Sequence, residues 1–460
     1  MPSSRKRGSP AGDRVRQQRT PDIAVQDAAR EVAASPLTPA GLLPGRGNMR
    51  LLQQSLGNTG IARLLSARPG SRVLAGVLQR QEPAVEDVPA EAEEAPLLDA
   101  GQIADARRYY TAQPWLYTAA IITQLREALG LDPDGGVDDA LVLAVAEFQS
   151  TDGAGDPALA VDGKAGPRTL PRIFRAGLNV EETAEEFGEE VQTEVIDDWT
   201  TLATAEARRD RLVELVNERL AAAGVPVVTA AFDANANNAG SFDFTTWTME
   251  IGQARLGGDS ISEEDARDIT DTVYHEARHT EQWFRMAQLR AGQGLSVAAM
   301  VTELGIEPRI ATAAAALPLA RGSMEAVIAQ GWWDSVYGSG ANHREAVLDE
   351  VDAAATARTN AEAAHAANPT ADTQAALDEA NERFDVAFAA YQNLPEENDA
   401  WATGPLAAAG ISGGSPEPAP EPAAGGLPGE AGEPAGTPPP AEGPAHDVMP
   451  EENLPAGGAP

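Results

Sequence analysis

The hydrophobic pattern between residues 101 and 404 is mainly that of helices. Apolar residues recur three and four positions apart in five segments, which predicts helices over 119–129, 139–148, 169–176, 205–223 and 260–292. In the longest segment, Ser260 and Glu263 have the spacing of a capping box, and Gly292 is a typical stop. We therefore expect one uninterrupted helix between Ser260 and Gly292.

Two shorter stretches have the pattern of strands, and a later one that of paired helices. Apolar and polar residues alternate over 225–232 and 241–251, which predicts two strands. Residues 342–392 are rich in alanine and are interrupted by Asn368-Pro369-Thr370, which indicates a long helical hairpin. A short helix is expected to open at Pro395. The expected fold class is α+β, mostly α.

Composition divides the rest of the chain. The 460 residues include 43 Gly and 34 Pro, and Pro and Gly are frequent at both ends, so we expect disordered N- and C-terminal tails. The predicted organisation is a disordered basic arm (1–48), an amphipathic segment (49–81), an acidic linker (82–100), a small helical domain (101–178), a larger domain (180–404) and a disordered tail (405–460).

Charge and residue usage limit the chemistry. The net charge is −36, and a strongly acidic chain of this kind repels nucleic acid, so no nucleic-acid partner is expected. There are no cysteines, and any metal must therefore be held by His and carboxylates. No window has the ~20 apolar residues of a membrane span. The N-terminus lacks a Sec-type signal, so export would need another route.

A candidate metal motif lies inside the longest predicted helix. His275 and His279 are four residues apart, so both can face one ion from the same side of a helix. Glu276 lies on the same turn, where a carboxylate can take a proton from metal-bound water. Two His and a carboxylate form a typical Zn²⁺ set. Three apolar residues share one side of the helix and are expected to bury it: Ile269, Val273 and Ala277.

The surrounding segment, residues 272–283, resembles the active-site helix of zincin metallopeptidases. The resemblance implies a hydrolase with Zn²⁺ on His275 and His279, Glu276 as the catalytic residue, and a strand such as 241–251 along the substrate cleft. The third-ligand pattern of metzincins is absent, because Gln282 and Arg285 stand where that pattern has Gly and His. A gluzincin-like arrangement, with a Glu from a later helix, is therefore expected.

Three glutamates compete for the third ligand position. Glu397 stands three residues before Ala400, and this Glu-x-x-Ala turn resembles the ligand helix of gluzincins, in which a small residue lets two helices approach. Glu345 precedes an Asp by four residues, and Glu350 opens a second Glu-x-x-Ala turn. We favour Glu397 because it opens a short helix after the hairpin. Among the tyrosines, Tyr337 is a candidate oxyanion donor.

The small helical domain has its own pattern. Residues 144–149 read AVAEFQ and residues 161–169 read VDGKAGPRT, which resembles the peptidoglycan-binding-like domain, a three-helix family. We expect positive φ at Gly163 and Gly166, and Thr169 as the cap of the last helix. The resemblance implies either binding of peptidoglycan or a structural spacer.

The N-terminal segment suggests how the protein is delivered. Residues 51–65 read LLQQSLGNTGIARLL and residues 77–81 read VLQRQ, which resembles the leader of cargo proteins associated with extracellular contractile injection systems. The resemblance implies a partner, the tube or spike of an injection particle. It also implies a protein that is cytoplasmic at synthesis and is then injected outside the cell without a Sec signal peptide.

Three functions are compatible with these features. The first is a zinc metallopeptidase effector or toxin that cleaves a peptide or protein substrate. The second is a cell-wall peptidase directed to peptidoglycan by residues 101–178. The third is a non-enzymatic structural cargo of the injection particle. The intact His275, Glu276 and His279 set favours an enzyme.

Overall fold

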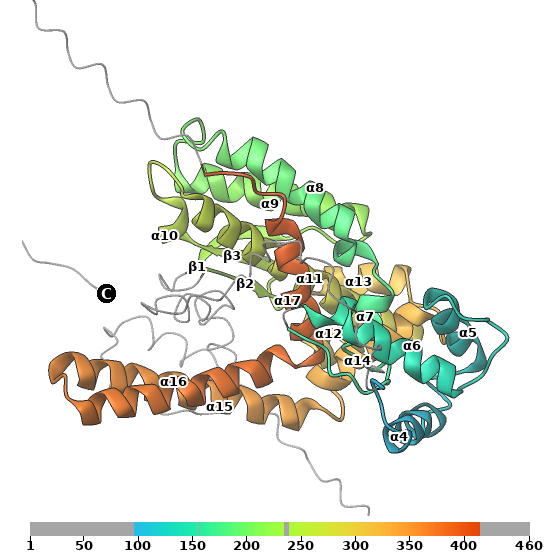
Figure 1. Ribbon diagram of the computed structural model, residues 1–460. Coiled ribbons are helices and arrows are strands. Elements are labelled where there is room, and N and C mark those ends of the chain that lie inside the picture. Colours follow the sequence, from blue (N-terminus) through green and yellow to red (C-terminus); the bar gives the residue numbers. More distant parts are fainter. Residues whose placement is uncertain (1–95, 156, 234–238, 415–460) are drawn as a thin grey trace, which may run out of the picture. The chain divides into compact units, whose positions relative to one another are not determined.

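The computed structural model describes residues 96–155, 157–233 and 239–414, and this part of the chain is mostly helical (Figure 1). The mostly-α class is therefore confirmed, and strands are few. The predictions for residues 1–48 and 49–81, for most of the linker and for the tail beyond residue 414 lie outside the described residues.

The first helices form a small bundle. Its elements are α4 (Ala100–Thr111), α5 (Ala119–Ala128), α6 (Asp139–Ser150), η1 (Asp152–Ala154), α7 (Leu170–Ile173) and η2 (Gly177–Asn179). The helices expected over 119–129 and 139–148 are confirmed, the one over 169–176 is shorter than expected, and α4 was not predicted. Tyr110, Leu125 and Val145 are fully or almost fully buried and form the centre of the bundle.

The loop before α7 is organised by one buried amide. Gln149 accepts hydrogen bonds from the backbone N–H groups of Asp162 and Gly163, and its NH₂ group donates to Thr169 Oγ1 at 3.3 Å. Gly163 has φ +69° as predicted, whereas Gly166 is not in the left-handed region. Thr169 occupies the N-cap position of α7 as predicted, but its hydroxyl bonds Gln149 and makes no capping hydrogen bond.

The next elements build a small sheet with helices around it. They are α8 (Glu181–Val191), the π-helical turn η3 (Gln192–Ile196), α9 (Ala205–Ala222), β1 (Thr229–Asp233), β2 (Gly240–Asp243), β3 (Thr248–Gly252) and α10 (Gln253–Leu256). The strand order is β1-β3-β2, with β3 parallel to β1 and antiparallel to β2. Strand β2 is thus an edge of this sheet.

The prediction of one strand over 241–251 is wrong, because a turn divides it. The Asp243 carboxylate accepts a hydrogen bond from the backbone N–H of Thr245 and others from the hydroxyls of Thr245 and Thr246. Such bonds from an Asp to groups two and three residues later favour a turn over a continuing strand. Trp247 follows with φ +54°, and the chain returns as β3.

Helix α11 (Glu263–Gly292) runs through the core. Ile269, Val273 and Ala277 are buried as predicted, but most other residues of its middle turns are buried too. The helix is therefore covered on all sides and not on one face only. The predicted cap at Ser260 is wrong. The N-cap is Ser262, two residues later, and its hydroxyl accepts a hydrogen bond from the backbone N–H of Asp265.

Helices complete the described chain. They are α12 (Val297–Leu304), α13 (Pro308–Ala316), α14 (Met324–Val336), α15 (Ala341–Ala367), α16 (Ala371–Gln392) and α17 (Pro395–Ala408). Helices α15 and α16 form the predicted hairpin and run side by side in Figure 1. The tail was predicted to begin at residue 405, but Pro405 lies inside α17, and Ile411 after it is buried. The folded part continues because these residues have apolar neighbours to pack against.

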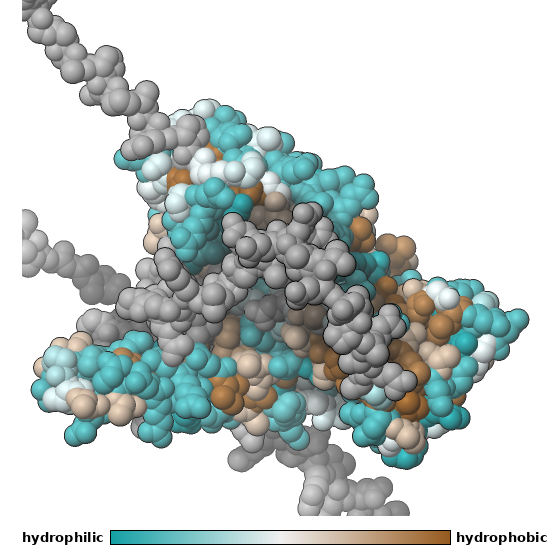
Figure 2. Space-filling view, viewed as in Figure 1, coloured by the Kyte–Doolittle hydropathy of each residue, from teal (hydrophilic) through white to brown (hydrophobic). Residues whose placement is uncertain are grey.

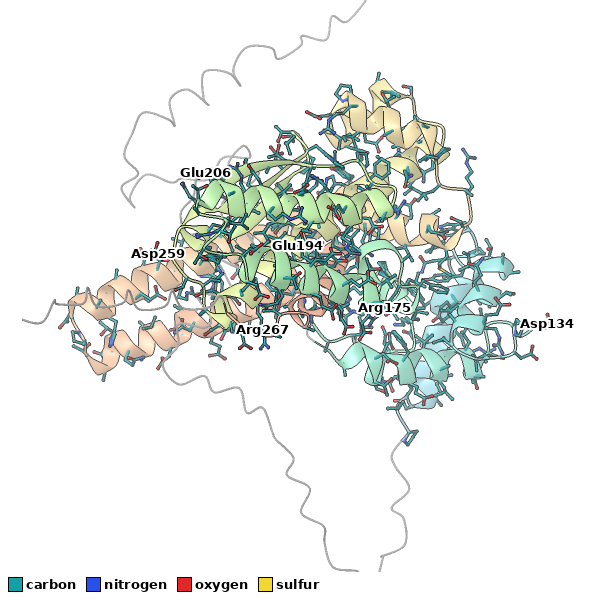
Figure 3. The ribbon with its side chains drawn as sticks, turned by 90° about the horizontal axis from the view of Figure 1, so that it is seen from above. Asp134, Arg175, Glu194, Glu206, Asp259 and Arg267 are labelled. Carbon is teal, nitrogen blue, oxygen red and sulfur yellow. The ribbon has the colours of Figure 1, made fainter. Side chains whose placement is uncertain are left out.

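Charged side chains cover the surface of the described part. Asp134, Arg175 and Asp259 are among the residues labelled in Figure 3, and all three are exposed. The face of the hairpin that Figure 2 shows is largely hydrophilic. Large exposed apolar residues are few in the described ranges and include Trp115 in the small bundle and Val386 on α16.

Candidate metal centre

Two helices bring three metal-binding side chains together. His275 and His279 of α11 and Glu397 of α17 are buried, and each offers one ligand atom within 4.8 Å of the others. The Nε2 atoms of His275 and His279 are 3.1 Å apart. Glu397 Oε2 lies 3.4 Å from Nε2 of His279 and 3.9 Å from Nε2 of His275. The three donors therefore surround a common point and could hold a metal ion.

The spacing suits a tetrahedral ion. Zinc binds His nitrogen and carboxylate oxygen at about 2.0–2.1 Å, so that neighbouring donors in a tetrahedron lie about 3.3 Å apart. The three separations, 3.1, 3.4 and 3.9 Å, bracket this value. The residues present thus fit a zinc ion with three protein ligands, the number typical of catalytic zinc sites, which keep the fourth position for water.

Glu397 reaches the two histidines because α17 lies close against α11 and α8. Ala400, one turn after Glu397, is fully buried, and its backbone is hydrogen-bonded by the His275 ring. Gly404 leaves no room for a side chain, since a Cβ atom there would lie 2.0 Å from Oδ1 of Asp271. Gly188 of α8 is equally close to the α17 backbone, with its Cβ position 2.0 Å from the carbonyl oxygen of Ala407. Small residues thus set the distance between these helices.

The two alternative glutamates are elsewhere. Glu345 and Glu350 are exposed residues of α15, and neither belongs to the buried group. Glu350 instead pairs with Arg383 of α16 at 2.8 Å. Tyr337 is not free to act as an oxyanion donor, because its hydroxyl donates to the Leu304 carbonyl at 3.0 Å and accepts from the indole of Trp283.

Glu276 lies between the ligand group and the edge strand. Glu276 is only 5% exposed, and the backbone N–H of Phe242 in β2 lies near its carboxylate and favours the charged form. A Cβ atom at Gly240 would lie 3.9 Å from Glu276 Cγ. The outer edge of β2 therefore faces Glu276.

Burial and mutual charge shift the pKa values of these groups in the metal-free site. Burial and then the His279 ring lower the pKa of His275 to about 3, and burial raises the pKa of Glu276 to about 8. Burial alone would lower the pKa of His279, but the Glu397 carboxylate outweighs it and raises this pKa to about 9. Burial alone would raise the pKa of Glu397, but His279 lowers it to about 2. A bound cation would take the place of the proton that His279 holds beside the ionised Glu397.

Several buried polar residues around the group were not singled out from the sequence. Gln282 is hydrogen-bonded to both His279 and Asp399, and Arg344 donates to Glu396 at 2.7 Å beside Glu397. Tyr391 is buried and hydrogen-bonds Glu397. Gln282 could have been found, because it lies three residues after His279 on one helix face. The others come from distant segments and left no local signal.

The chain matches no family profile, no curated protein and no solved structure. In residues 96–155, 157–233 and 239–414, none of the helices combines the length and the apolar character needed to cross a bilayer.

Proposed function

We propose that this chain is a zinc-dependent metallopeptidase, with His275, His279 and Glu397 as metal ligands and Glu276 as the general base. The observation that carries the proposal is the buried convergence of three ligand atoms within 4.8 Å, beside a buried glutamate. Buried polar groups that are held together in this way cost folding free energy, and a cation that unites them explains their presence.

The chemistry follows from the positions of the side chains. Zinc, when bound, supplies a Lewis acid that polarises the scissile carbonyl and lowers the pKa of a bound water. Glu276 takes a proton from the water whose oxygen attacks the carbonyl carbon. As the C–N bond breaks, Glu276 gives that proton to the leaving amine nitrogen. A gluzincin-like zincin fold is part of this proposal.

The substrate is proposed to be an extended peptide that lies along β2. An edge strand offers unpaired backbone groups, to which a peptide can add as a further strand. The edge position of β2 and the closeness of the Phe242 backbone N–H to Glu276 support this arrangement. A peptide aligned there would have its backbone next to the proposed base.

The decisive test compares two Glu→Gln variants of the full chain. Glu276→Gln is expected to lower hydrolysis of a fluorescent casein by about 10²–10⁴-fold, while zinc content after dialysis stays equal to that of the wild type. Glu264→Gln, an exposed residue in the first turn of the same helix, serves as the matched control and should keep full activity. Equal activity in wild type and Glu276→Gln would rule out Glu276 as the base.

We further propose that the enzyme is an effector of a contractile injection system, as the resemblance of residues 51–65 and 77–81 to cargo leaders suggests. The second candidate function is a cell-wall peptidase. It is favoured by the peptidoglycan-binding-like pattern of 101–178 and by the contact of Arg172 at its end with Asn398, next to Glu397. Incubation with purified peptidoglycan distinguishes the two, because release of muropeptides without cleavage of casein would replace the first proposal by the second.

A further inference from the structure

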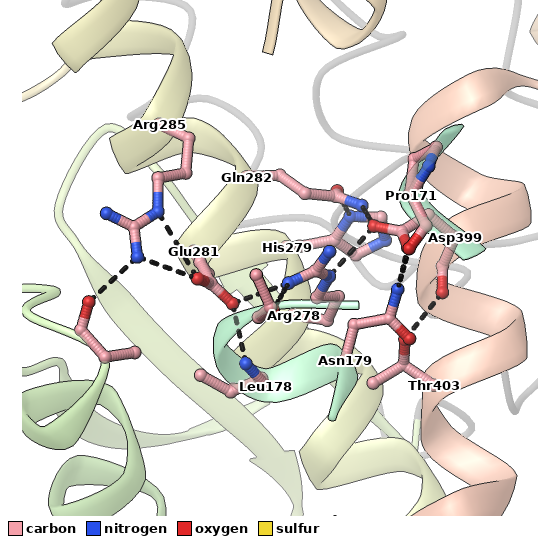
Figure 4. Close-up of polar contacts among 12 residues, drawn as sticks. Pro171, Leu178, Asn179, Arg278, His279, Glu281, Gln282, Arg285, Asp399 and Thr403 are labelled. Carbon is pink, nitrogen blue, oxygen red and sulfur yellow. Dashed lines mark hydrogen bonds and ion pairs between the residues drawn. The ribbon is translucent and has the colours of Figure 1, made fainter. Parts of the chain in front are cut away.

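A chain of hydrogen bonds continues behind His279, on the side of the ring that faces away from the other ligands. Nδ1 of His279 lies 2.8 Å from Oε1 of Gln282 (Figure 4). The Gln282 NH₂ group donates to the backbone carbonyl of Glu396 at 2.9 Å and to Oδ2 of Asp399 at 2.8 Å. All of these side chains are buried.

This pattern fixes which nitrogen of His279 keeps its proton when a cation binds the ring. A backbone carbonyl can only accept, so the Gln282 group that faces Glu396 must be the NH₂, and the group that faces His279 must be the oxygen. An amide oxygen can also only accept, so Nδ1 of His279 must be the donor. Nε2 is then the nitrogen available to a cation, and it is the atom that faces His275 and Glu397.

We propose that Gln282 and Asp399 are positioning residues of the metal centre, which hold His279 in the Nδ1–H form and lock the helix of the third ligand against α11. The proposal rests on the proposed metal centre and adds two residues that touch neither metal nor substrate. Asp399 is two residues after Glu397 on α17, so its bond to Gln282 links the ligands of both helices in one network.

Asp399 is itself held from two further sides. Its Oδ2 accepts Nε of Arg278 at 2.8 Å, and its Oδ1 accepts the Asn179 side chain at 3.0 Å. Arg278 also pairs with Glu281, which accepts the backbone N–H of Leu178 at 2.9 Å and bonds Arg285 (Figure 4). Arg278 and Arg285 thus balance the charges of Asp399 and Glu281. Such pairing is needed to keep carboxylates buried. The position of Asp399, and with it that of Gln282, is set by its direct partners Arg278 and Asn179.

Outer partners of this kind raise the basicity of a ligand and restrict its ring, and their loss typically lowers metal affinity by about 10–100-fold. Gln282→Met removes the acceptor of the Nδ1 proton while keeping the length of the side chain. Gln288→Met makes the same change two turns later on α11, where the amide donates to the Leu317 carbonyl and its oxygen accepts from Arg285. It is a matched control for the loss of a buried glutamine.

The test measures zinc affinity of the full-length protein by competition with a chelator, together with the visible spectrum of the cobalt-substituted protein and metal-free thermal unfolding. We expect Gln282→Met to weaken zinc binding about 10–100-fold and to change the cobalt spectrum. Gln288→Met should change neither the zinc affinity nor the cobalt spectrum. Its metal-free melting temperature should shift by about as much as that of Gln282→Met. Asp399→Asn, which reaches His279 through Gln282, should also weaken zinc binding and provides a second variant.

Unchanged zinc affinity and cobalt spectrum in Gln282→Met would overturn the proposal, as would equal losses in Gln288→Met, since these would reflect general destabilisation. The outcome is separable from that of the proposed function. A wild-type protein that binds zinc but cleaves no peptide would refute the peptidase and leave the positioning role intact. A wild-type protein that binds no zinc would refute both.

Discussion

At the scale of single residues, Glu397 and Glu345 show how burial separates residues of equal chemistry. Glu397 is only 2% exposed and lies 3.4 Å from His279, whereas Glu345 is exposed on α15. A carboxylate that is removed from water gains most from a cation. Burial therefore favours Glu397 as the ligand.

The corresponding prediction concerns metal content. Glu397→Ala should abolish retention of zinc after dialysis, because a three-ligand site loses one of its donors. Glu345→Ala should retain as much zinc as the wild type. Atomic absorption on both purified variants checks this, and the opposite order would transfer the ligand role to Glu345.

A second residue-scale prediction concerns Asp271, which lies against α17 at Gly404. Burial, followed by the charge of Asp268, raises the pKa of Asp271 to about 7. Since this folded-state pKa exceeds the unfolded value of about 3.9, the contribution of Asp271 to stability is fully present below pH 4 and is lost as pH rises through 7. Asp271→Asn removes the carboxyl group, and with it the free-energy cost of ionising that group inside the folded protein.

We expect Asp271→Asn to match the wild type near pH 4 and to exceed it by roughly 1–3 kcal/mol at pH 8.5. Urea unfolding at both pH values in metal-free buffer measures the difference. Asp134→Asn, an exposed residue, should show no such pH dependence. A constant difference for Asp271→Asn across the range would contradict the assigned shift.

At the scale of elements, the centre depends on how closely α17 approaches its neighbours. Gly188 of α8 leaves space for the Ala407 carbonyl, which would be 2.0 Å from a Cβ atom at this position. Within a helix, Gly→Ala normally stabilises by about 1 kcal/mol. At Gly188 the clash with the Ala407 carbonyl opposes that gain, because a backbone carbonyl cannot rotate away as a side chain can.

Gly188→Ala is therefore expected to destabilise the protein by about 1–3 kcal/mol and to weaken zinc binding, since α17 carries Glu397. Thermal unfolding and zinc competition test both effects. Gly136→Ala is the control, because no atom lies within 4 Å of its Cβ position. A stabilised Gly188→Ala protein would show that α17 can shift without loss.

At the scale of the whole described chain, the small helical bundle is joined to α11 and α17 by direct contacts. Arg172 of α7 donates to the side chain of Asn398 at 3.0 Å, and Asn179 bonds Asp399. The backbone of Leu178 bonds Glu281 of α11. The end of the predicted small domain, residues 172–179, is thus packed against the candidate metal centre and does not form a free linker.

This arrangement predicts different outcomes for two truncations. A fragment of residues 96–414 keeps every contact described above and should bind zinc as the full chain does. A fragment of residues 180–414 lacks Arg172, Leu178 and Asn179, and should bind zinc at least tenfold more weakly and melt at a lower temperature. Equal zinc affinity of the two fragments would show that the bundle contributes nothing to the centre.

The sequence alone determined the features that depend on local spacing. The four-residue interval of His275 and His279, the alanine-rich hairpin and the short helix opening at Pro395 are properties of neighbouring residues, and the structure contains each of them. Even Glu397 could be favoured, because the small residue one turn after it indicated a close helix contact. These patterns reflect helix periodicity, which needs no knowledge of the fold.

The tertiary structure decided what depends on residues far apart in the chain. It excluded Glu345 and Glu350 from the buried group of possible metal ligands. It paired the Tyr337 hydroxyl with the Leu304 carbonyl and divided the expected strand into β2 and β3. It also brought Asp399 and Asn179 to the back of His279 by way of Gln282. Burial and hydrogen bonding across 100 or more residues have no periodic signature, so only the packing of α11, α17 and the small bundle could reveal them.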